Sequence, residues 1–79
     1  MLELYYSETC PYCKKVISNF DNQKIIYKPM DVSLRENYER LLGLGHMSQV
    51  PFLYDSDNDI KMYESDKIIE YVEKNYRAA

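Results

Sequence analysis

Residues 2–13 read LELYYSETCPYC, and in this stretch a strand pattern passes directly into a helix start. Alternating apolar residues predict a β-strand over residues 2–6. The proline between Cys10 and Cys13 suits the first position of a helix, where its missing N–H loses no hydrogen bond. Apolar residues then recur at helical spacing, so a helix with one apolar face is expected over residues 11–21. The two cysteines therefore lie at the junction of a strand and a helix.

The rest of the chain alternates between strand and helix patterns. Short apolar segments bounded by proline or turn residues predict three more strands, over residues 25–29, 50–54 and 60–63. Residues 55–59 (DSDND) are rich in side chains that bond their own backbone, which predicts a hairpin turn. The order β-α-β-α-β-β-α favours an α/β domain with a four-stranded mixed sheet flanked by three helices. Its first β-α-β unit is expected to be parallel and right-handed, and its last two strands antiparallel.

The two later helices are recognised by their ends. Ser33, with Glu36 three residues later, forms a capping box that predicts a helix start. Gly43 and Gly45 predict its end, and its expected apolar face consists of Leu34, Tyr38, Leu41 and Leu42. The last helix is expected over residues 65–76, with an inward face of Ile68, Ile69, Val72 and Tyr76.

Length and composition describe an ordinary globular protein. A chain of 79 residues is enough for one domain, which we place at residues 1–79. A net charge of −3 without a cluster of basic residues argues against a nucleic-acid partner. No apolar run is long enough for a membrane span, and the N-terminus lacks the pattern of a signal peptide, so a cytoplasmic location is expected. The predicted fold needs no partner to bury its core, so we expect a monomer.

The spacing of the cysteines suits thiol–disulfide exchange. A bridge between them closes too short a loop to constrain the unfolded chain, so stability is not its purpose. If Pro11 is the first helical residue, Cys10 is the N-cap, and its sulfur faces the unsatisfied N–H groups of Tyr12 and Cys13. The helix N-terminus, with the nearby cations of Lys14-Lys15, favours a thiolate there, whereas burial keeps the inner thiol protonated. We predict that Cys10 is the nucleophile and Cys13 the resolving thiol.

The cysteine pair has two other interpretations. Cys-x-x-Cys can be half of a zinc site, but zinc takes about four ligands. The chain offers only His46 as a nitrogen ligand, so we expect no metal. The other alternative is a purely structural pair of thiols. The position of the motif at a helix start favours redox exchange over both. His46 lies in a glycine-rich segment, and we give it no catalytic role.

The sequence resembles the dithiol glutaredoxins. Cys10-Pro11-Tyr12-Cys13, preceded by Glu8-Thr9, is similar to their active-site motif, and Val50-Pro51 matches the position of their Val–cis-Pro pair. The resemblance covers essentially the whole chain and implies a thioredoxin-like fold. Glu64-Ser65 instead resembles the N-terminal domain of glutathione transferases, which share this fold. Because the chain lacks the helical second domain of those enzymes, conjugation of electrophiles is not expected.

The resemblance implies a glutathione-binding groove lined by Tyr12, Val50, Pro51, Glu64, Ser65 and Asp66. The backbone of Val50 would pair with the cysteine moiety of glutathione, and Pro51 would lie beside the reactive sulfur. The N–H of Ser65 and the carboxylate of Asp66 would hold the γ-glutamyl end, in keeping with anion binding at helix N-termini. The alternative for these two residues is an ordinary helix N-cap followed by a first-turn acid.

The chain departs from the glutaredoxin pattern at three places: Ser7 replaces a common lysine, Gln49 a common threonine, and Tyr63-Glu64 the usual glycine pair. The implied activity is reduction of protein–glutathione mixed disulfides and protein disulfides, in cell redox homeostasis. Its partners would be glutathione, as co-substrate rather than bound cofactor, and glutathionylated or disulfide-bonded proteins. Two alternatives stay open: an electron donor that works without glutathione, and a module that binds an iron–sulfur cluster through Cys10 and glutathione.

Overall fold

The fold is built on a four-stranded sheet in a computed structural model that describes residues 1–76. Its strands are β1 (Leu2–Tyr6), β2 (Lys28–Asp31), β3 (Phe52–Asp55) and β4 (Ile60–Tyr63), in the spatial order β2-β1-β3-β4. β1 runs parallel to β2, and the other neighbouring strands are antiparallel. The mixed sheet predicted from the sequence is thereby confirmed. Residues 77–79, the end of the expected domain, lie outside the described part of the chain.

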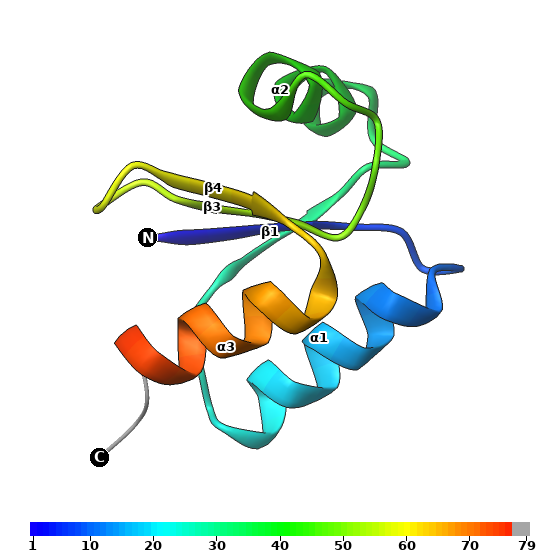
Figure 1. Cartoon of the computed structure of the whole chain (residues 1–79). Coiled ribbons are helices and arrows are strands. Elements are labelled where there is room, and N and C mark those ends of the chain that lie inside the picture. Colours follow the sequence, from blue (N-terminus) through cyan, green and yellow to red (C-terminus); the bar gives the residue numbers. More distant parts are fainter. Residues whose placement is uncertain (77–79) are drawn as a thin grey trace.

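Three helices cover the sheet: α1 (Pro11–Asn22), α2 (Arg35–Gly45) and α3 (Ser65–Asn75). Figure 1 shows α1 and α3 side by side on one face of the sheet, with α2 on the other. Both α1 and α3 begin at the same end of the molecule, on the right in Figure 1. The element order β-α-β-α-β-β-α agrees with the prediction. Two helix N-termini therefore point toward one region.

Apolar side chains fill the space on both sides of the sheet. The alternation of β1 sends Leu2 and Leu4 toward α1 and α3, and Tyr5 toward α2. The cluster on the α1–α3 side consists of Leu2, Leu4, Val16, Phe20, Ile25, Leu53, Ile68 and Val72. The cluster on the α2 side consists of Tyr5, Met30, Leu41 and Phe52. Each fully buried side chain of this size contributes about 1.5–3 kcal/mol, so these clusters hold the helices in place.

A buried carboxylate fastens the far end of α3 to the β3–β4 hairpin. Asp55 is 0% exposed and accepts hydrogen bonds of 2.6 Å from the hydroxyls of both Tyr71 and Tyr76. The side chain of Asn58 and the backbone N–H of Asp57 donate two more, at 2.9 and 3.1 Å. Burial alone would raise the pKa of Asp55, but these hydrogen bonds outweigh it and lower the pKa to about 2. Asp55, the first residue of the turn predicted at residues 55–59, thus fixes that turn to α3.

The second strand lies further along the chain than predicted. The sequence pattern predicts it over residues 25–29, ending at the proline, whereas β2 runs from Lys28 to Asp31 and includes Pro29. An edge strand tolerates proline because only one of its sides is paired. Ile25 belongs to the core as part of a turn, and its N–H donates to the Phe20 carbonyl at 2.9 Å.

The predicted capping box of the second helix is wrong. The N-cap of α2 is Leu34, without a side-chain cap bond, and the N–H of Ser33 instead donates to the Asp31 carboxylate at 2.9 Å. An aspartate that accepts from the N–H two residues later forms a turn of its own, which delays the helix. The expected apolar face is also too wide, because Leu34 is 55% exposed and Leu41 is the one fully buried member.

α2 ends at Gly45, one of the two glycines predicted to end it, but the left-handed cap that follows is His46 and not a glycine. Gly43 lies inside the helix, and the left-handed residue after it is His46, with φ 66°. A Cβ on Gly45 would collide with the hydroxyl of Tyr63, so this glycine allows α2 to approach β4 closely.

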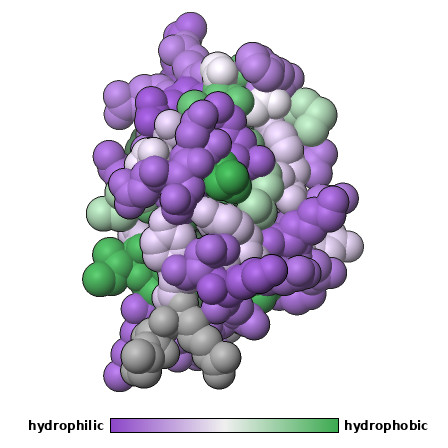
Figure 2. Space-filling view, turned by 60° about the vertical axis from the view of Figure 1, so that its left-hand side comes forward, coloured by the Kyte–Doolittle hydropathy of each residue, from purple (hydrophilic) through white to green (hydrophobic). Residues whose placement is uncertain are grey.

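One face of the molecule is largely polar (Figure 2). The face brought forward in Figure 2 is mostly hydrophilic, and its hydrophobic residues form small, separate patches. Among residues 1–76, none of the helices has the length and apolar character that a membrane crossing requires.

Candidate active site

The predicted nucleophile occupies the N-cap of α1. Cys10 has extended backbone angles, φ −89° and ψ 114°, and Pro11 follows as the first helical residue. The Cys10 sulfur accepts a hydrogen bond of 3.2 Å from the N–H of Cys13, one of the two donors expected from the sequence. It also lies 3.9 Å from the carbonyl oxygen of Val50 and is partly exposed. The N–H of Cys13 and the start of α1 thus face a sulfur that solvent and substrates can reach, whereas the Val50 carbonyl oxygen can accept from its thiol form.

The second thiol lies beneath the first. Cys13 is 0% exposed and forms part of the inner face of α1. Burial, reinforced by the hydrogen bond with the Cys10 sulfur, raises the pKa of Cys13 to about 12. Both cysteines are free thiols in this structure. The inner thiol therefore keeps its proton at neutral pH, while the outer sulfur is the one placed for attack.

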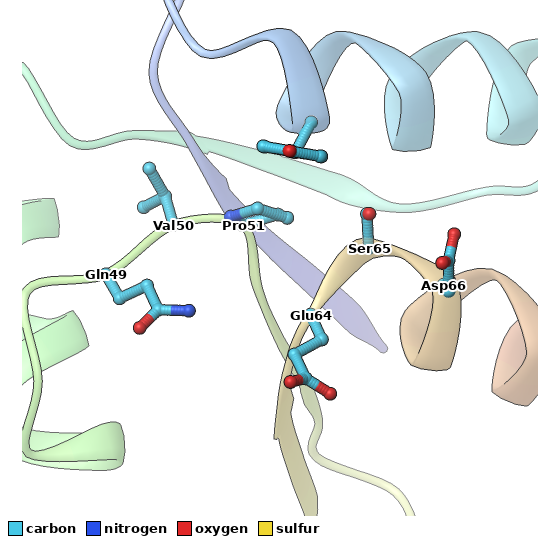
Figure 3. Close-up of a pocket in the computed structure, with 7 residues that line it drawn as sticks. Gln49, Val50, Pro51, Glu64, Ser65 and Asp66 are labelled. Carbon is cyan, nitrogen blue, oxygen red and sulfur yellow. The ribbon is translucent and has the colours of Figure 1, made fainter.

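A cavity of about 360 Å³ opens beside this pair. It is lined by Tyr12, Gln49, Val50, Pro51, Glu64, Ser65 and Asp66. Figure 3 shows that the loop before β3 and the turn before α3 border it, and that Ser65 and Asp66 extend toward the side on which α1 begins. All six residues proposed for a groove are thus brought together, and Gln49 joins them. The sequence marked Gln49 as a departure from a pattern but gave no reason to count it as a site residue.

The Val50-Pro51 peptide bond is cis, an isomer that the sequence alone did not determine. The loop that carries it is held from behind by Tyr63, whose hydroxyl donates to the carbonyl oxygen of Met47 at 3.0 Å. The ring of Tyr63 also packs against Phe52, with centroids 4.7 Å apart. Tyr63 therefore connects the loop to the turn before α3. In the sequence, Tyr63 stands out only as part of Tyr63-Glu64, the pair that replaces the usual glycines.

The N-terminus of α3 is open toward the cavity. Glu64, not Ser65, is the N-cap; it has φ 76° and makes no side-chain cap bond. Ser65 is the first helical residue and is buried. Interpretation of this turn as an ordinary serine cap is therefore wrong. Helix N–H groups that no cap satisfies favour a carboxylate or phosphate.

Two lysines form ion pairs with the carboxylates of Glu64 and Asp66 in the cavity lining. Lys15 of α1 pairs with Asp66 at 2.6 Å, and Lys67 pairs with Glu64 at 3.3 Å. Lys15 thus reaches across to α3 rather than toward Cys10. In residues 1–76 no group of three or more His, Cys, Asp or Glu side chains is arranged to hold a metal ion.

These features define a thioredoxin-like domain: a mixed four-stranded sheet, a Cys-x-x-Cys pair at the start of its first helix, and a cis-proline facing it. Residues 4–79 match the model of the glutathione S-transferase N-terminal domain. The chain belongs to this family.

Solved structures share the fold of this chain. The thioredoxin-like protein BC3987 superposes with a TM-score of 0.78 at 20% identity, covering 94% of this chain and 97% of that one. A glutathione S-transferase from the Antarctic clam Laternula elliptica gives a TM-score of 0.77 at 28% identity, over 95% of this chain and 35% of its own. The Leishmania trimeric glutathione transferase TDR1 gives 0.75 at 30% identity, over 94% and 17%. The chain thus spans about a third or less of these two transferases. No curated protein sequence matches the chain.

Proposed function

We propose that this protein is a glutaredoxin-type, glutathione-dependent thiol–disulfide oxidoreductase. The observation that carries the proposal is the arrangement of its two thiols. Cys10 is accessible at a helix N-terminus and accepts an N–H bond, whereas Cys13 is buried below it with a raised pKa. This asymmetry assigns attack to one sulfur and resolution to the other.

The first step is attack by the Cys10 thiolate on the glutathionyl sulfur of a protein–glutathione mixed disulfide. A bond forms between Cys10 and glutathione, the original S–S bond breaks, and the protein leaves as a thiolate that takes up a proton. A second glutathione then attacks the glutathionyl sulfur on Cys10. Oxidised glutathione leaves, and Cys10 returns to the thiolate. In the net reaction the substrate sulfur is reduced to a thiol, one free glutathione is oxidised, and the two glutathione units leave joined by a disulfide bond.

Cys13 provides a second route, toward protein disulfides. After Cys10 has formed a mixed disulfide with a protein substrate, Cys13 loses its proton, attacks the Cys10 sulfur and releases the substrate thiol. Glutathione then reduces the resulting internal disulfide. Because the pKa of Cys13 is raised to about 12, this step needs a base or the leaving thiolate to accept the proton.

Glutathione suits the cavity chemically. The Val50 backbone lies beside Cys10 and offers strand-like hydrogen bonds to the cysteine moiety. The uncapped N-terminus of α3 suits the γ-glutamyl carboxylate, and Asp66 suits its ammonium group. Family membership supports the same ligand. We further propose that residues 1–79 act in the cytoplasm as one domain and as a monomer.

The test is glutathione-dependent reduction of a glutathionylated peptide by the wild type, Cys10→Ser and Cys13→Ser proteins. We expect Cys10→Ser to abolish activity and Cys13→Ser to retain it, because the monothiol route needs only the outer sulfur. Loss of activity in both variants, with both still folded by circular dichroism, contradicts a monothiol glutathione route. An inactive wild type whose disulfide is reduced by a thioredoxin reductase supports a glutathione-independent donor instead.

A second candidate is conjugation of glutathione to electrophiles, which the family match favours. The two activities differ in what happens to the sulfur of glutathione, which a conjugating enzyme alkylates rather than oxidises. Thioether formation with a chlorinated nitrobenzene distinguishes them. Conjugation that persists in Cys10→Ser would favour the transferase role, because conjugation does not need a redox-active protein thiol.

A further inference from the structure

We propose that Lys15 is a specificity-determining residue that selects the γ-glutamyl end of the substrate through its ion pair with Asp66. This inference rests on the proposed function and concerns a residue outside the cavity lining. It starts from an imbalance of charge. The lining includes the carboxylates of Glu64 and Asp66 but no lysine or arginine. Glutathione has one more carboxylate than ammonium groups, so the side chains of this lining hold no cation to balance it, and the open N-terminus of α3 is its one positive feature.

The missing positive charge lies just behind the lining. The ammonium of Lys15 is 2.6 Å from the Asp66 Oδ1 atom, the shortest ion pair among residues 1–76. Both side chains are more than half exposed, at 55% and 83%, so a ligand can reach the pair. Glu64 is balanced by Lys67 at 3.3 Å, an i,i+3 pair within the turn region of α3 itself. Among the ion pairs of residues 1–76, the one between Lys15 and Asp66 brings a cation from α1 to a residue of the cavity lining.

The pair is complementary to an α-amino acid head group. Its bond to Lys15 occupies one oxygen of the Asp66 carboxylate, which leaves Oδ2 to accept from the ligand ammonium. The Lys15 ammonium then faces the ligand carboxylate together with the open N-terminus of α3. The γ-glutamyl head group therefore makes two favourable contacts: its ammonium with Asp66 and its carboxylate with Lys15. A thiol ligand without the γ-glutamyl residue makes neither.

The test compares two fluorescent peptides in single-turnover release of the peptide thiol. One carries a mixed disulfide with glutathione and the other with cysteinylglycine, which is glutathione without its γ-glutamyl residue. No free glutathione is added, so the rate reports only the first exchange at Cys10. The variants are Lys15→Gln, Lys15→Arg and Lys15→Glu. Lys14→Gln is the matched control, because it removes the same charge from the same helical turn and no ion pair of Lys14 occurs in residues 1–76.

We expect Lys15→Gln to raise the half-saturating concentration of the glutathionyl peptide about fivefold. The limiting rate of Lys15→Gln with the glutathionyl peptide, and its rate with the cysteinylglycine peptide, should change less than about twofold. Lys15→Glu should weaken binding at least about tenfold, since it places like charges together. Lys15→Arg should restore most of the preference, because arginine also pairs with a carboxylate. If Lys15 had only a general structural role, its loss would slow thiol release from both peptides equally.

Unchanged preference for the glutathionyl peptide in Lys15→Gln overturns the inference while leaving the proposed function intact. An equal loss of preference in Lys14→Gln also overturns it, because a general field would then explain the effect. If the wild type releases thiol from neither peptide, the proposed function fails and this inference falls with it. In an Asp66→Asn background, Lys15→Gln should add less than about twofold, since the pair is already broken.

Discussion

The buried carboxylate of Asp55 makes the stability of the fold dependent on pH in a predictable window. Its pKa is lowered from an ordinary 3.8 to about 2 by the hydroxyls of Tyr71 and Tyr76 and the Asn58 amide, against the opposing effect of burial. A folded-state pKa below the unfolded value means that the folded protein binds its proton less readily. The stabilisation is therefore fully present above about pH 4 and is lost as the pH falls through about 2. The difference corresponds to about 2 kcal/mol of unfolding free energy.

Asp55→Asn should remove this dependence. We expect the wild type to lose about 2 kcal/mol more than the variant between pH 5 and pH 2. At pH 7 the variant should be less stable by about 3 kcal/mol, because an amide cannot accept all the bonds that a carboxylate accepts. Urea unfolding followed by circular dichroism at each pH measures both effects.

Asp59→Asn is the matched control, since Asp59 lies in the same turn with a largely exposed side chain and tolerates asparagine at its φ of 52°. This control should unfold within about 0.5 kcal/mol of the wild type at pH 7 and keep its acid dependence. Parallel stability curves for Asp55→Asn and the wild type would refute the reasoning, because the hydrogen bonds to Asp55 would then carry no net free energy.

The remaining predictions concern the inner thiol and the two glycines. In a Cys10→Ser protein, the rate of Cys13 alkylation by iodoacetamide should rise about tenfold per pH unit up to pH 10, because burial keeps the pKa of Cys13 raised. Intact mass measures the rate, and a rate that levels off below pH 10 contradicts the prediction. Gly45→Ala should lower the unfolding free energy by about 1–3 kcal/mol, since the new methyl group displaces the Tyr63 hydroxyl from its bond. Gly43→Ala should instead raise the unfolding free energy by up to about 1 kcal/mol, because the new Cβ meets no other atom and alanine favours the helix. Thermal unfolding of the Gly43→Ala and Gly45→Ala proteins measures both effects; destabilisation by both substitutions contradicts the prediction for Gly43.

Local signals in the sequence predicted the elements that local chemistry controls. A proline at a helix start fixed the N-cap position of Cys10, and alternation fixed both the range and the two faces of β1. Apolar spacing also placed Cys13 and Ile68 on buried helix faces. In each case the signal lies within a few residues of the feature it determines, so no knowledge of the rest of the fold is needed.

The sequence-based predictions fail where the structure depends on a residue distant in sequence or on a competing local hydrogen bond. Ser33 looks like a cap, but the Asp31 carboxylate takes its N–H first. Gly45 does end α2, but the left-handed cap is the next residue, His46, and the close approach of Tyr63 to Gly45 has no local signal in the sequence. The pairing of Lys15 with Asp66 spans 51 positions of the chain, and no spacing rule relates them. Such features are set by packing of α1 against α3 and of α2 against β4, which only the assembled fold defines.

The composition of the two outer strands bears on behaviour at high concentration. β2 and β4 are the edges of the sheet, where unpaired backbone groups can recruit a strand from another molecule. Both edges carry an exposed lysine, Lys28 and Lys61, and β2 also contains Pro29, which has no N–H to offer. A strand that docked on β2 would meet a positive charge and a missing donor, and one that docked on β4 would meet a positive charge. We therefore expect these edges to resist intermolecular β-pairing, so that the protein stays dispersed when crowded.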